Sequence, residues 1–487
     1  MYSEKLCIRV IYCIGGLCML CGFIITLSWA WAFDVMRKEN LHLFPSSESY
    51  RLWVKTPMPL FMELYLFNWS NADTFLMDET VKPSFTQVGP FVFKEVHEKV
   101  AVLWNDNETV TYNQTRSWYF VPEKSVNLSF PITNINVALT AIAKAASTHN
   151  IFVQGLLDFL INKYKEKLIV TRPAEEWLFK GMNDKLLDFL RKHKPTSVPF
   201  DRFGWFYARN QSSSYDGRFN VQTGKNNIYN MGLVNMWNND HRTEYFEGEC
   251  GIIRGTTSEI FPPLQSNQDS LTIFLSDFCG TFTLHKSGPV KVRGLEGYRF
   301  FGGDQVFDNG TKYSESECFC TGNCSPSGVR NESLCRKAPV FISFPHFYLA
   351  DSTYVNAVEG LKPNKSKHEF YITIHELTGL PLEVCAQLQI NVLLEPIPLV
   401  PIFSKVPKIY VPMMWFRQRI ELTDELISLG MKAQFFNFMG YALGCVFLFL
   451  GLLIIAINAV KLRYFNNQRD ESLIISNEEK EDAEDTD

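Results

Sequence analysis

Two charge-free apolar stretches lie near opposite ends of the chain. The first covers residues 10–33 and the second covers residues 433–460. Each is longer than the roughly 20 apolar residues that an α-helix needs to cross a hydrocarbon core about 30 Å thick. We therefore predict two membrane-spanning helices that flank one large domain over residues 34–432, with short tails over residues 1–9 and 461–487.

The Asn-x-Ser/Thr sequons indicate which side of the membrane the large domain occupies. Eight well-formed sequons occur, and all of them lie between the two apolar stretches. One sequon is common by chance, but eight in a single segment predict glycosylation in the secretory lumen. The tails then face the cytosol, in agreement with the Lys and Arg residues that flank both stretches. The predicted glycosylation sites are Asn68, Asn107, Asn113, Asn127, Asn210, Asn309, Asn331 and Asn364.

The first apolar stretch has a second interpretation, because Ala30-Trp31-Ala32 resembles a signal-peptidase site. Cleavage there would start the mature chain at Phe33 and leave a single span. A cleaved signal has a hydrophobic region of about 7–15 residues, and this stretch is longer. An uncleaved signal anchor is therefore the preferred interpretation.

The net charge of −5 is not spread over the chain. Residues 461–487 contain four basic and nine acidic side chains, so this tail accounts for the whole imbalance. The rest of the chain is balanced, and nothing in it suggests a nucleic-acid partner.

Six of the seven cysteines between the two stretches cluster over residues 250–335. In an oxidising compartment such a cluster predicts three disulfides. The rival interpretation is a zinc site at Cys318, Cys320 and Cys324, but no histidine accompanies them. The seventh, Cys385, is expected to be a free, buried side chain. We expect neither a metal site nor a cofactor.

The domain begins with strand-like alternation and then becomes helical. Residues 60–67 and 89–96 alternate as strands do, and residues 99–104 are the expected partner of the second. Residues 138–194 are predicted to form an inserted helical subdomain. The remainder to about residue 395 is strand-like and rich in turns, so the fold class is α+β with a mainly antiparallel sheet.

Two helices are expected inside the helical subdomain. The first should place Val153, Leu157, Leu160, Ile161 and Tyr164 on one face. The second should run from residue 174 to residue 194 with Leu186, Leu187 and Leu190 on its apolar side, because Pro173 favours a helix start.

These two helices carry many cationic side chains. A cationic patch attracts anionic lipids or particles by screened Coulomb attraction. Acidic residues are interspersed among them, so an ordinary solvated helix face is the competing interpretation. The cationic side chains are Lys163, Lys165, Lys167, Lys180, Lys185, Arg191, Lys192, His193 and Lys194.

The sequence contains none of the local motifs of common enzymes. It has no Gly-x-Ser-x-Gly elbow, phosphate-binding loop or dinucleotide fingerprint. His375-Glu376 begins like a zinc-protease motif, but the second histidine is missing. We therefore do not expect an enzyme, although a triad assembled from dispersed residues is not visible in one sequence.

With these features in hand, the chain resembles the class B scavenger receptor family, the family of fatty acid translocase, lysosomal integral membrane protein two and the insect croquemort, and it looks like an insect-type member. The resemblance covers nearly the whole length. The segments that carry it are residues 64–68, 89–95, 261–263, 298–300, 318–320, 339–347 and 360–364.

The resemblance implies a lumenal antiparallel barrel-like core, an apical helical bundle that receives hydrophobic cargo, and an internal lipid tunnel. It places Lys163, Lys165, Lys167 and Lys180 in the ligand-binding region, and Cys7 where family members are palmitoylated. It also implies three disulfide pairs, which are Cys250–Cys318, Cys279–Cys335 and Cys320–Cys324.

The function implied is a plasma-membrane scavenger receptor for lipids, lipoproteins or anionic phospholipid particles such as those on apoptotic cells. A dry corridor would speed the transfer of acyl chains, because each buried CH₂ gains about 0.8 kcal/mol. Three alternatives stay open: a lysosomal membrane receptor of the same fold, a two-span ligand-gated channel, and an ectoenzyme. Asp470-Glu471-Ser472-Leu473-Ile474 resembles an acidic dileucine signal that would bind sorting adaptors, and a homo-oligomer is compatible with the sequence.

Overall fold

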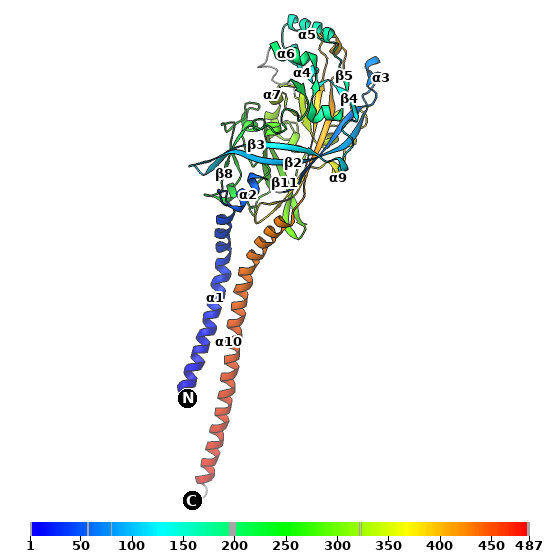
Figure 1. Ribbon diagram of the computed structural model, residues 1–487. Helices are drawn as coiled ribbons and strands as arrows, with labels where there is room; N and C mark the ends of the chain where they lie inside the picture. Colours follow the sequence, from blue (N-terminus) through cyan, green and yellow to red (C-terminus); the bar gives the residue numbers. More distant parts are fainter. Residues whose placement is uncertain are drawn as a thin grey trace. The chain divides into compact units, whose positions relative to one another are not determined.

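The computed structural model describes residues 2–55, 58–78, 80–193, 201–320, 322 and 324–484. The chain divides into two compact units (Figure 1). Met1–Glu39 and Ser428–Asp487 form the first, which consists of the terminal helices. Asn40–Ile427 form the second, which holds the sheet and the shorter helices.

The terminal helices α1 (Tyr2–Leu41) and α10 (Asp424–Glu484) are long and apolar enough to cross a membrane. They pack against each other as an antiparallel pair whose contacts recur every seven residues, the spacing of a two-stranded coiled coil. A Cβ added to Gly22 would lie 2.8 Å from the Gly444 carbonyl oxygen, so the backbones approach closely. The contacts pair Ile8 with Asn458, Gly15 with Gly451, Gly22 with Gly444, and Trp29 with Asn437.

The polar groups of α10 take part in this helix pairing. Asn458 is buried, and its Nδ2 donates to the Ile8 carbonyl oxygen at 3.0 Å. The Asn437 carbonyl oxygen accepts a hydrogen bond from Trp29 Nε1, also at 3.0 Å. The Asn458 side chain is therefore used within the helix pair, whereas at Asn437 the hydrogen bond involves only the backbone.

The second unit is built on a 13-stranded antiparallel sheet. In spatial order its main path consists of β10 (Ser270–Leu275), β11 (Gly280–Val292), β12 (Leu295–Phe301), β15 (Tyr371–His375), β16 (Pro381–Leu394), β17 (Ile409–Ile420), β1 (Leu60–Trp69), β2 (Phe85–Asn105), β3 (Thr109–Phe120), β8 (Arg218–Gln222) and β9 (Val234–Trp237). Off this path, β13 (Arg330–Asn331) pairs with β14 (Val340–Ser343), and β14 pairs with β16.

Strand β2 is longer than predicted. Residues 89–96 and 99–104 belong to this one strand, so the prediction that they pair with each other is wrong. Gly89 lies inside the strand, where the register with β1 shifts, and does not end a turn. The chain reverses only at residues 106–108, where Glu108 has a positive φ of 60°, and β3 then pairs with β2.

The two edge strands of the sheet are linked through one residue. Thr256 forms an antiparallel bridge with Leu233, next to β9, and a parallel bridge with Ile273 of β10. The Phe274 amide donates to the Thr256 carbonyl oxygen at 2.7 Å. The sheet is therefore a nearly closed barrel, which agrees with the predicted barrel-like core.

Aromatic side chains fill much of the core. Tyr65 of β1 stacks on Trp415 of β17 with ring centroids 4.1 Å apart. Phe91 of β2 and Phe300 of β12, from strands far apart in the sheet order, belong to the same buried cluster.

Five short helices accompany the sheet in the described part of the chain. They are α2 (Glu48–Val54), α3 (Ala72–Met77), α7 (Ser333–Arg336), α8 (Ser352–Asn356) and α9 (Lys365–His368).

The predicted helical subdomain is present, but its second helix is interrupted. It contains α4 (Val137–Ser147), α5 (Ile151–Tyr164), a π-helical turn η2 (Glu176–Lys180) and α6 (Lys185–His193). The prediction of one helix from residue 174 to 194 is wrong, because Gly181 takes a φ of 76° and a Cβ there would lie 2.9 Å from Arg202 Cβ. Lys194 lies outside the described residues. Two small sheets join the subdomain: β4 (Pro131–Ile135) with β5 (Ile169–Pro173), and β6 (Met182–Asn183) with β7 (Arg202–Phe203).

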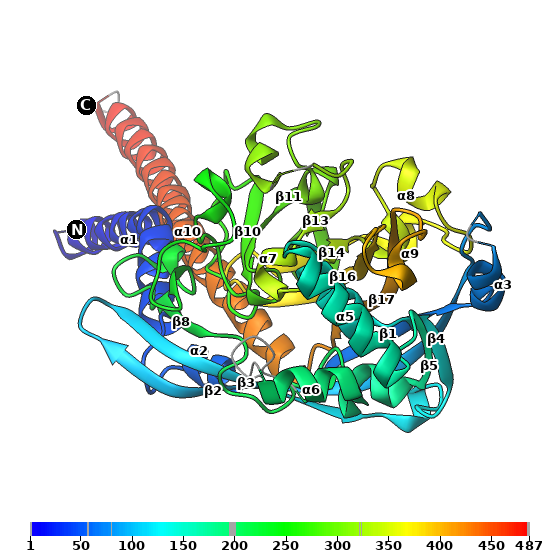
Figure 2. The ribbon, with the colours of Figure 1, turned by 90° about the horizontal axis from the view of Figure 1, so that it is seen from above.

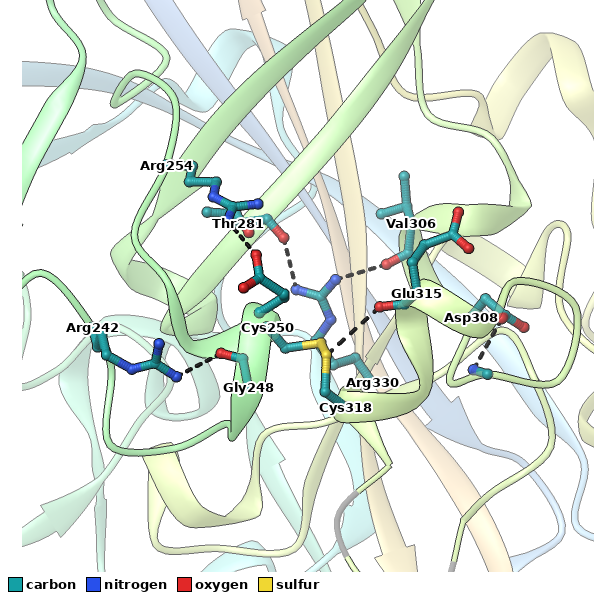
Figure 3. The surroundings of a disulfide bond; sticks show 12 residues. Arg242, Gly248, Cys250, Arg254, Thr281, Val306, Asp308, Glu315, Cys318 and Arg330 are labelled. Atoms are coloured by element: carbon teal, nitrogen blue, oxygen red, sulfur yellow. Dashed lines mark hydrogen bonds and ion pairs between the residues drawn. A yellow bond between two sulfur atoms is a disulfide. The ribbon is translucent and has the colours of Figure 1, made fainter.

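Three disulfides are present, with the pairing that the family resemblance implies. They join Cys250 to Cys318, Cys279 to Cys335, and Cys320 to Cys324, while Cys385 is free and buried. Figure 3 shows the first of them beside Arg330, whose guanidinium donates to the carbonyl oxygens of Thr281 at 3.1 Å and Val306 at 2.8 Å. The first bond joins two short turns, and the second joins the connection between β10 and β11 to α7.

A network of charged side chains is buried inside the barrel wall. Arg209 contacts Asp216 at 2.7 Å and also pairs with Asp277. Arg116 of β3 contacts Asp216 at 3.0 Å and Asp277 at 3.5 Å. Each carboxylate thus faces two guanidiniums, which compensates for the desolvation of all four groups.

The network continues along β2 toward the residues that link the sheet edges. Both ring nitrogens of His97 contact carboxylates, Glu95 at 2.5 Å and Glu259 at 2.6 Å. Lys99, whose side chain is fully buried, also pairs with Glu259. Since Glu259 lies three residues after Thr256, its contacts with His97 and Lys99 hold the linking segment against β2.

Candidate functional site

Helix α5 is positioned by polar residues at both ends. Asn150 precedes it, and its Oδ1 accepts a hydrogen bond from the Val153 amide at 3.2 Å, an N-cap. Lys165 ends it in a left-handed conformation with a φ of 57°. Its buried side packs Leu157, Leu160 and Ile161 into the main core. Figures 1 and 2 show α5 and α6 beside β4 and β5.

The opposite side of α5 is also apolar, and it is exposed. Phe152 has 83% of its surface exposed, which is unusual for so large an apolar side chain in a folded domain. The predicted face with Val153, Leu157, Leu160, Ile161 and Tyr164 is the one that packs inward, although Val153 in the first turn stays partly exposed and Tyr164 is half-buried. The α5 apolar face consists of Ile151, Phe152, Leu156 and Phe159.

Three of the predicted ligand-binding lysines follow directly on this face. Lys163 is in the last turn of α5, Lys165 ends the helix and Lys167 is two residues further on; we call these three the lysine turn. All three are exposed, and no carboxylate of the described residues lies within 4 Å of their ammonium groups. Lys163 Nζ lies 5.4 Å from the Tyr164 ring and 5.9 Å from the Phe189 ring of α6, so aromatic rings help to hold it.

Lys180 is placed differently from the lysine turn. It lies at the end of the π-helical turn, and its ammonium pairs with the Glu175 carboxylate at 2.7 Å. This neighbour raises the pKa of Lys180. Because its charge is already paired, Lys180 is the least suited of the four predicted lysines to attract an external anion.

Glu166 interrupts the lysine turn with a half-buried carboxyl group. Its burial, and then the nearby Asp184 carboxylate, raise the pKa of Glu166 from 4.5 to about 7. At pH 7 the segment from Lys163 to Lys167 therefore carries less negative charge than its sequence suggests. From the sequence, Glu166 is expected to be a solvated acid. Its neighbours Asp184 and Leu186 lie about twenty residues further along the chain, so no local pattern reveals its burial.

The predicted glycosylation sites avoid the helical subdomain. None of the eight sequons lies between residues 128 and 209, so α4, α5 and α6 carry none. The Asn127 and Asn364 side chains are exposed, whereas Asn309 is buried and its Nδ2 donates to the Ser325 carbonyl oxygen. A buried asparagine leaves little room for a glycan, which makes Asn309 the weakest of the eight predictions.

Cys7 lies on α1 and is exposed, as an acylated residue must be. Among the described residues, no group of three or more His, Cys, Asp or Glu side chains is arranged to hold a metal ion. The candidate site is therefore the α5 apolar face together with the lysine turn. Exposed apolar side chains next to unpaired cations can bind a lipid surface, which offers acyl chains below anionic headgroups.

Comparison with known proteins gives the same assignment as the motifs. A model of the CD36 family matches residues 13–462. The chain is similar to Protein peste of Drosophila melanogaster, with 35% identity covering 87% of this chain and 77% of that protein. It is also similar to Scavenger receptor class B member 1 of Sus scrofa, with 29% identity covering 85% and 82%. Lysosome membrane protein 2 of Homo sapiens shares 29% identity covering 82% of each chain.

The family match spans both terminal helices, the barrel and the helical subdomain, and the expected membership of the class B scavenger receptor family is confirmed. The chain belongs to the CD36 family.

Proposed function

We propose that this protein is a plasma-membrane scavenger receptor that binds anionic lipid particles through its helical subdomain. Its relatives include proteins named scavenger receptors. One observation carries the proposal: the α5 apolar face is exposed beside three lysines that have no carboxylate partner among the described residues. The apolar side chains would enter the particle surface while the lysines contact its anionic headgroups.

The proposal includes transfer of cargo, such as acyl chains, to the membrane through an internal tunnel. The barrel and its aromatic core supply a low-polarity environment for such a path. We place both termini in the cytosol, with Cys7 as an acylation site, and treat a lysosomal location as the alternative because one relative is named for that membrane. Lipids that copurify with the full-length protein, identified by mass spectrometry against an unrelated two-span protein, would identify the cargo; no enriched lipid would contradict transfer.

Binding is tested with the full-length protein in neutral nanodiscs and vesicles of phosphatidylcholine and phosphatidylserine. We expect Phe152→Ser to weaken vesicle binding about tenfold, since it removes the 1.5–3 kcal/mol that burial of such a side chain contributes. Leu399→Ser, which also replaces an exposed apolar side chain but lies outside the helical subdomain, is the control and should bind normally. Equal binding by both variants would contradict insertion of the α5 apolar face.

Binding should also depend on pH through Glu166. Protonation removes a negative charge from the lysine turn, so lowering the pH from about 8 to about 6 should strengthen vesicle binding roughly 2–5-fold. Because its pKa is raised, Glu166 contributes fully to stability below pH 4.5, and the contribution is lost as the pH rises through about 7. Glu166→Gln should bind at about pH 8 as tightly as the parent does at about pH 6. A parent pH dependence that survives this substitution would assign the effect to other groups.

A further inference from the structure

A pocket lined mainly by amide side chains lies between the β2–β3 hairpin tip and the segment from β8 to β9. It has a volume of about 210 Å³ and is open to solvent. The tip of the β2–β3 hairpin contributes Asn107 and Thr109, and the segment from β8 to β9 contributes Gln222, Asn226 and Asn230, among others. The pocket is smaller than the roughly 300–1,000 Å³ that drug-sized ligands occupy.

The walls of this pocket are held together by hydrogen bonds. The Glu108 carbonyl oxygen accepts from the Thr223 amide at 3.0 Å and from Thr223 Oγ1 at 2.9 Å. Its carboxylate contacts Lys225 Nζ at 2.9 Å. The hairpin tip and the β8–β9 segment are thus joined in the folded protein, so the pocket does not need a ligand to form it.

Asn107, at the rim, is the first residue of a sequon and is oriented for modification. Its Oδ1 accepts a hydrogen bond from Thr109 Oγ1 at 2.7 Å, and the side chain is exposed. Within the described part of the chain, Asn107 Nδ2 donates no hydrogen bond. In contrast, Nδ2 of Asn113 donates to the Ser213 carbonyl oxygen at 3.0 Å. The sequon with a free amide nitrogen therefore borders a polar pocket.

We propose that Asn107 carries an N-linked glycan whose first sugar ring lies in this pocket. The inference rests on the lumenal orientation in the proposed function. In the modification, Asn107 Nδ2 loses one proton and bonds to the anomeric carbon of a lipid-diphosphate-linked oligosaccharide, and the lipid diphosphate departs as the leaving group. The amides around the pocket offer both donors and acceptors, which match the hydroxyl and acetamido groups of an N-acetylhexosamine.

Covalent attachment makes weak contacts effective, since the sugar cannot diffuse away from the pocket. A seated sugar ring would shield its own bond to Asn107 from a glycosidase. Asn127 is the matched reference: it is exposed, and its Oδ1 accepts from Ser129 Oγ at 2.8 Å in the same way, but it is not among the residues that line the pocket.

The test uses the full-length protein from a glycosylating eukaryotic host, with glycopeptide mass spectrometry at each sequon. During digestion of the folded protein by peptide N-glycosidase, we expect release at Asn107 about tenfold slower than at Asn127, equivalent to one or two net hydrogen bonds. Asn226→Trp, which fills the pocket, should make the two rates equal without changing occupancy. Asn107→Gln should lower the melting temperature, whereas Asn127→Gln should not.

Equal release rates in the unsubstituted protein would overturn the seating of the sugar. An unmodified Asn107 in a protein modified at other sequons would overturn the inference while leaving the proposed function intact. A protein modified at none of its sequons would overturn the lumenal orientation, and with it the proposed function.

Discussion

Arg209→Met is expected to lower the free energy of unfolding by about 3–5 kcal/mol, the cost of breaking a buried ion pair from one side. Arg209 is buried against Asp216 and Asp277, and methionine keeps an unbranched apolar stem but removes the guanidinium and its charge. Burial alone raises the pKa of the Asp277 carboxyl, but the guanidiniums of Arg209 and Arg116 outweigh it and leave the pKa below its usual value. Without Arg209, Arg116 would remain to compensate both carboxylates, with a weaker contribution from Arg336 at Asp277.

Thermal unfolding of the full-length protein in detergent measures this effect. The matched control is Arg254→Met, since Arg254 pairs with Glu249 and both side chains are more than half exposed. Exposed pairs contribute about 0–1 kcal/mol, so the control should change the melting temperature little. Arg209→Lys keeps the charge, but lysine lacks the planar guanidinium that contacts two carboxylates at once. Its change in melting temperature should fall between those of Arg209→Met and Arg254→Met. A shift for Arg209→Met no larger than the control's would show that the buried network is not needed for stability.

This network also shows where sequence reasoning ends. Along β2 the inward side chains are Glu95, His97 and Lys99, whereas Val96 and Val100 are half-buried on the other face. A prediction based on hydrophobicity alone would place Val96 and Val100 on the buried face of the strand and the charged residues on the exposed face. The partners that permit the burial, such as Arg116 and Glu259, are distant in sequence, so no local window contains the information.

The features that could be predicted were those with a strong local period or a strong family pattern. The two terminal helices follow from length and apolarity, and strand β1 follows from its alternation over residues 60–67. The helix break at Gly181 and the continuation of β2 through Gly89 could not be predicted. Glycine is compatible with both a turn and an extended strand, so its presence does not distinguish them.

Helix α5 was predicted correctly as a helix, and the predicted face with Leu157, Leu160 and Ile161 is the buried one. It is apolar on nearly all sides, with Gln154 buried and Phe152 exposed. The exposed apolar side was not predicted, because apolar residues all round a helix usually indicate burial on every side.

Charge reversal of the lysine turn should have the largest effect on function. The triple variant Lys163→Glu, Lys165→Glu and Lys167→Glu is expected to weaken binding of phosphatidylserine vesicles at least about 100-fold, because each cation near an anionic membrane contributes about 1 kcal/mol. The lysines are exposed and lack carboxylate partners among the described residues, so their replacement should leave folding and surface expression unchanged.

The control reverses three other exposed lysines that also lie close together in sequence: Lys362, Lys365 and Lys367 in and before α9. Of these, Lys365 pairs with Glu369 at 3.6 Å, and a pair with so exposed a lysine contributes little to stability. Both triple variants change the net charge of the protein by the same amount. Figure 1 shows α9 well away from α5, so only the lysine-turn variant changes the charge of the helical subdomain. Added salt should weaken the parent and the α9 variant alike and affect the lysine-turn variant little, since screening acts on an attraction that this variant has lost. If both triple variants bind equally, long-range charge rather than the lysine turn recruits the particle. Loss confined to the lysine-turn variant would place the attraction at the end of α5, where the apolar side chains are exposed to enter the same surface.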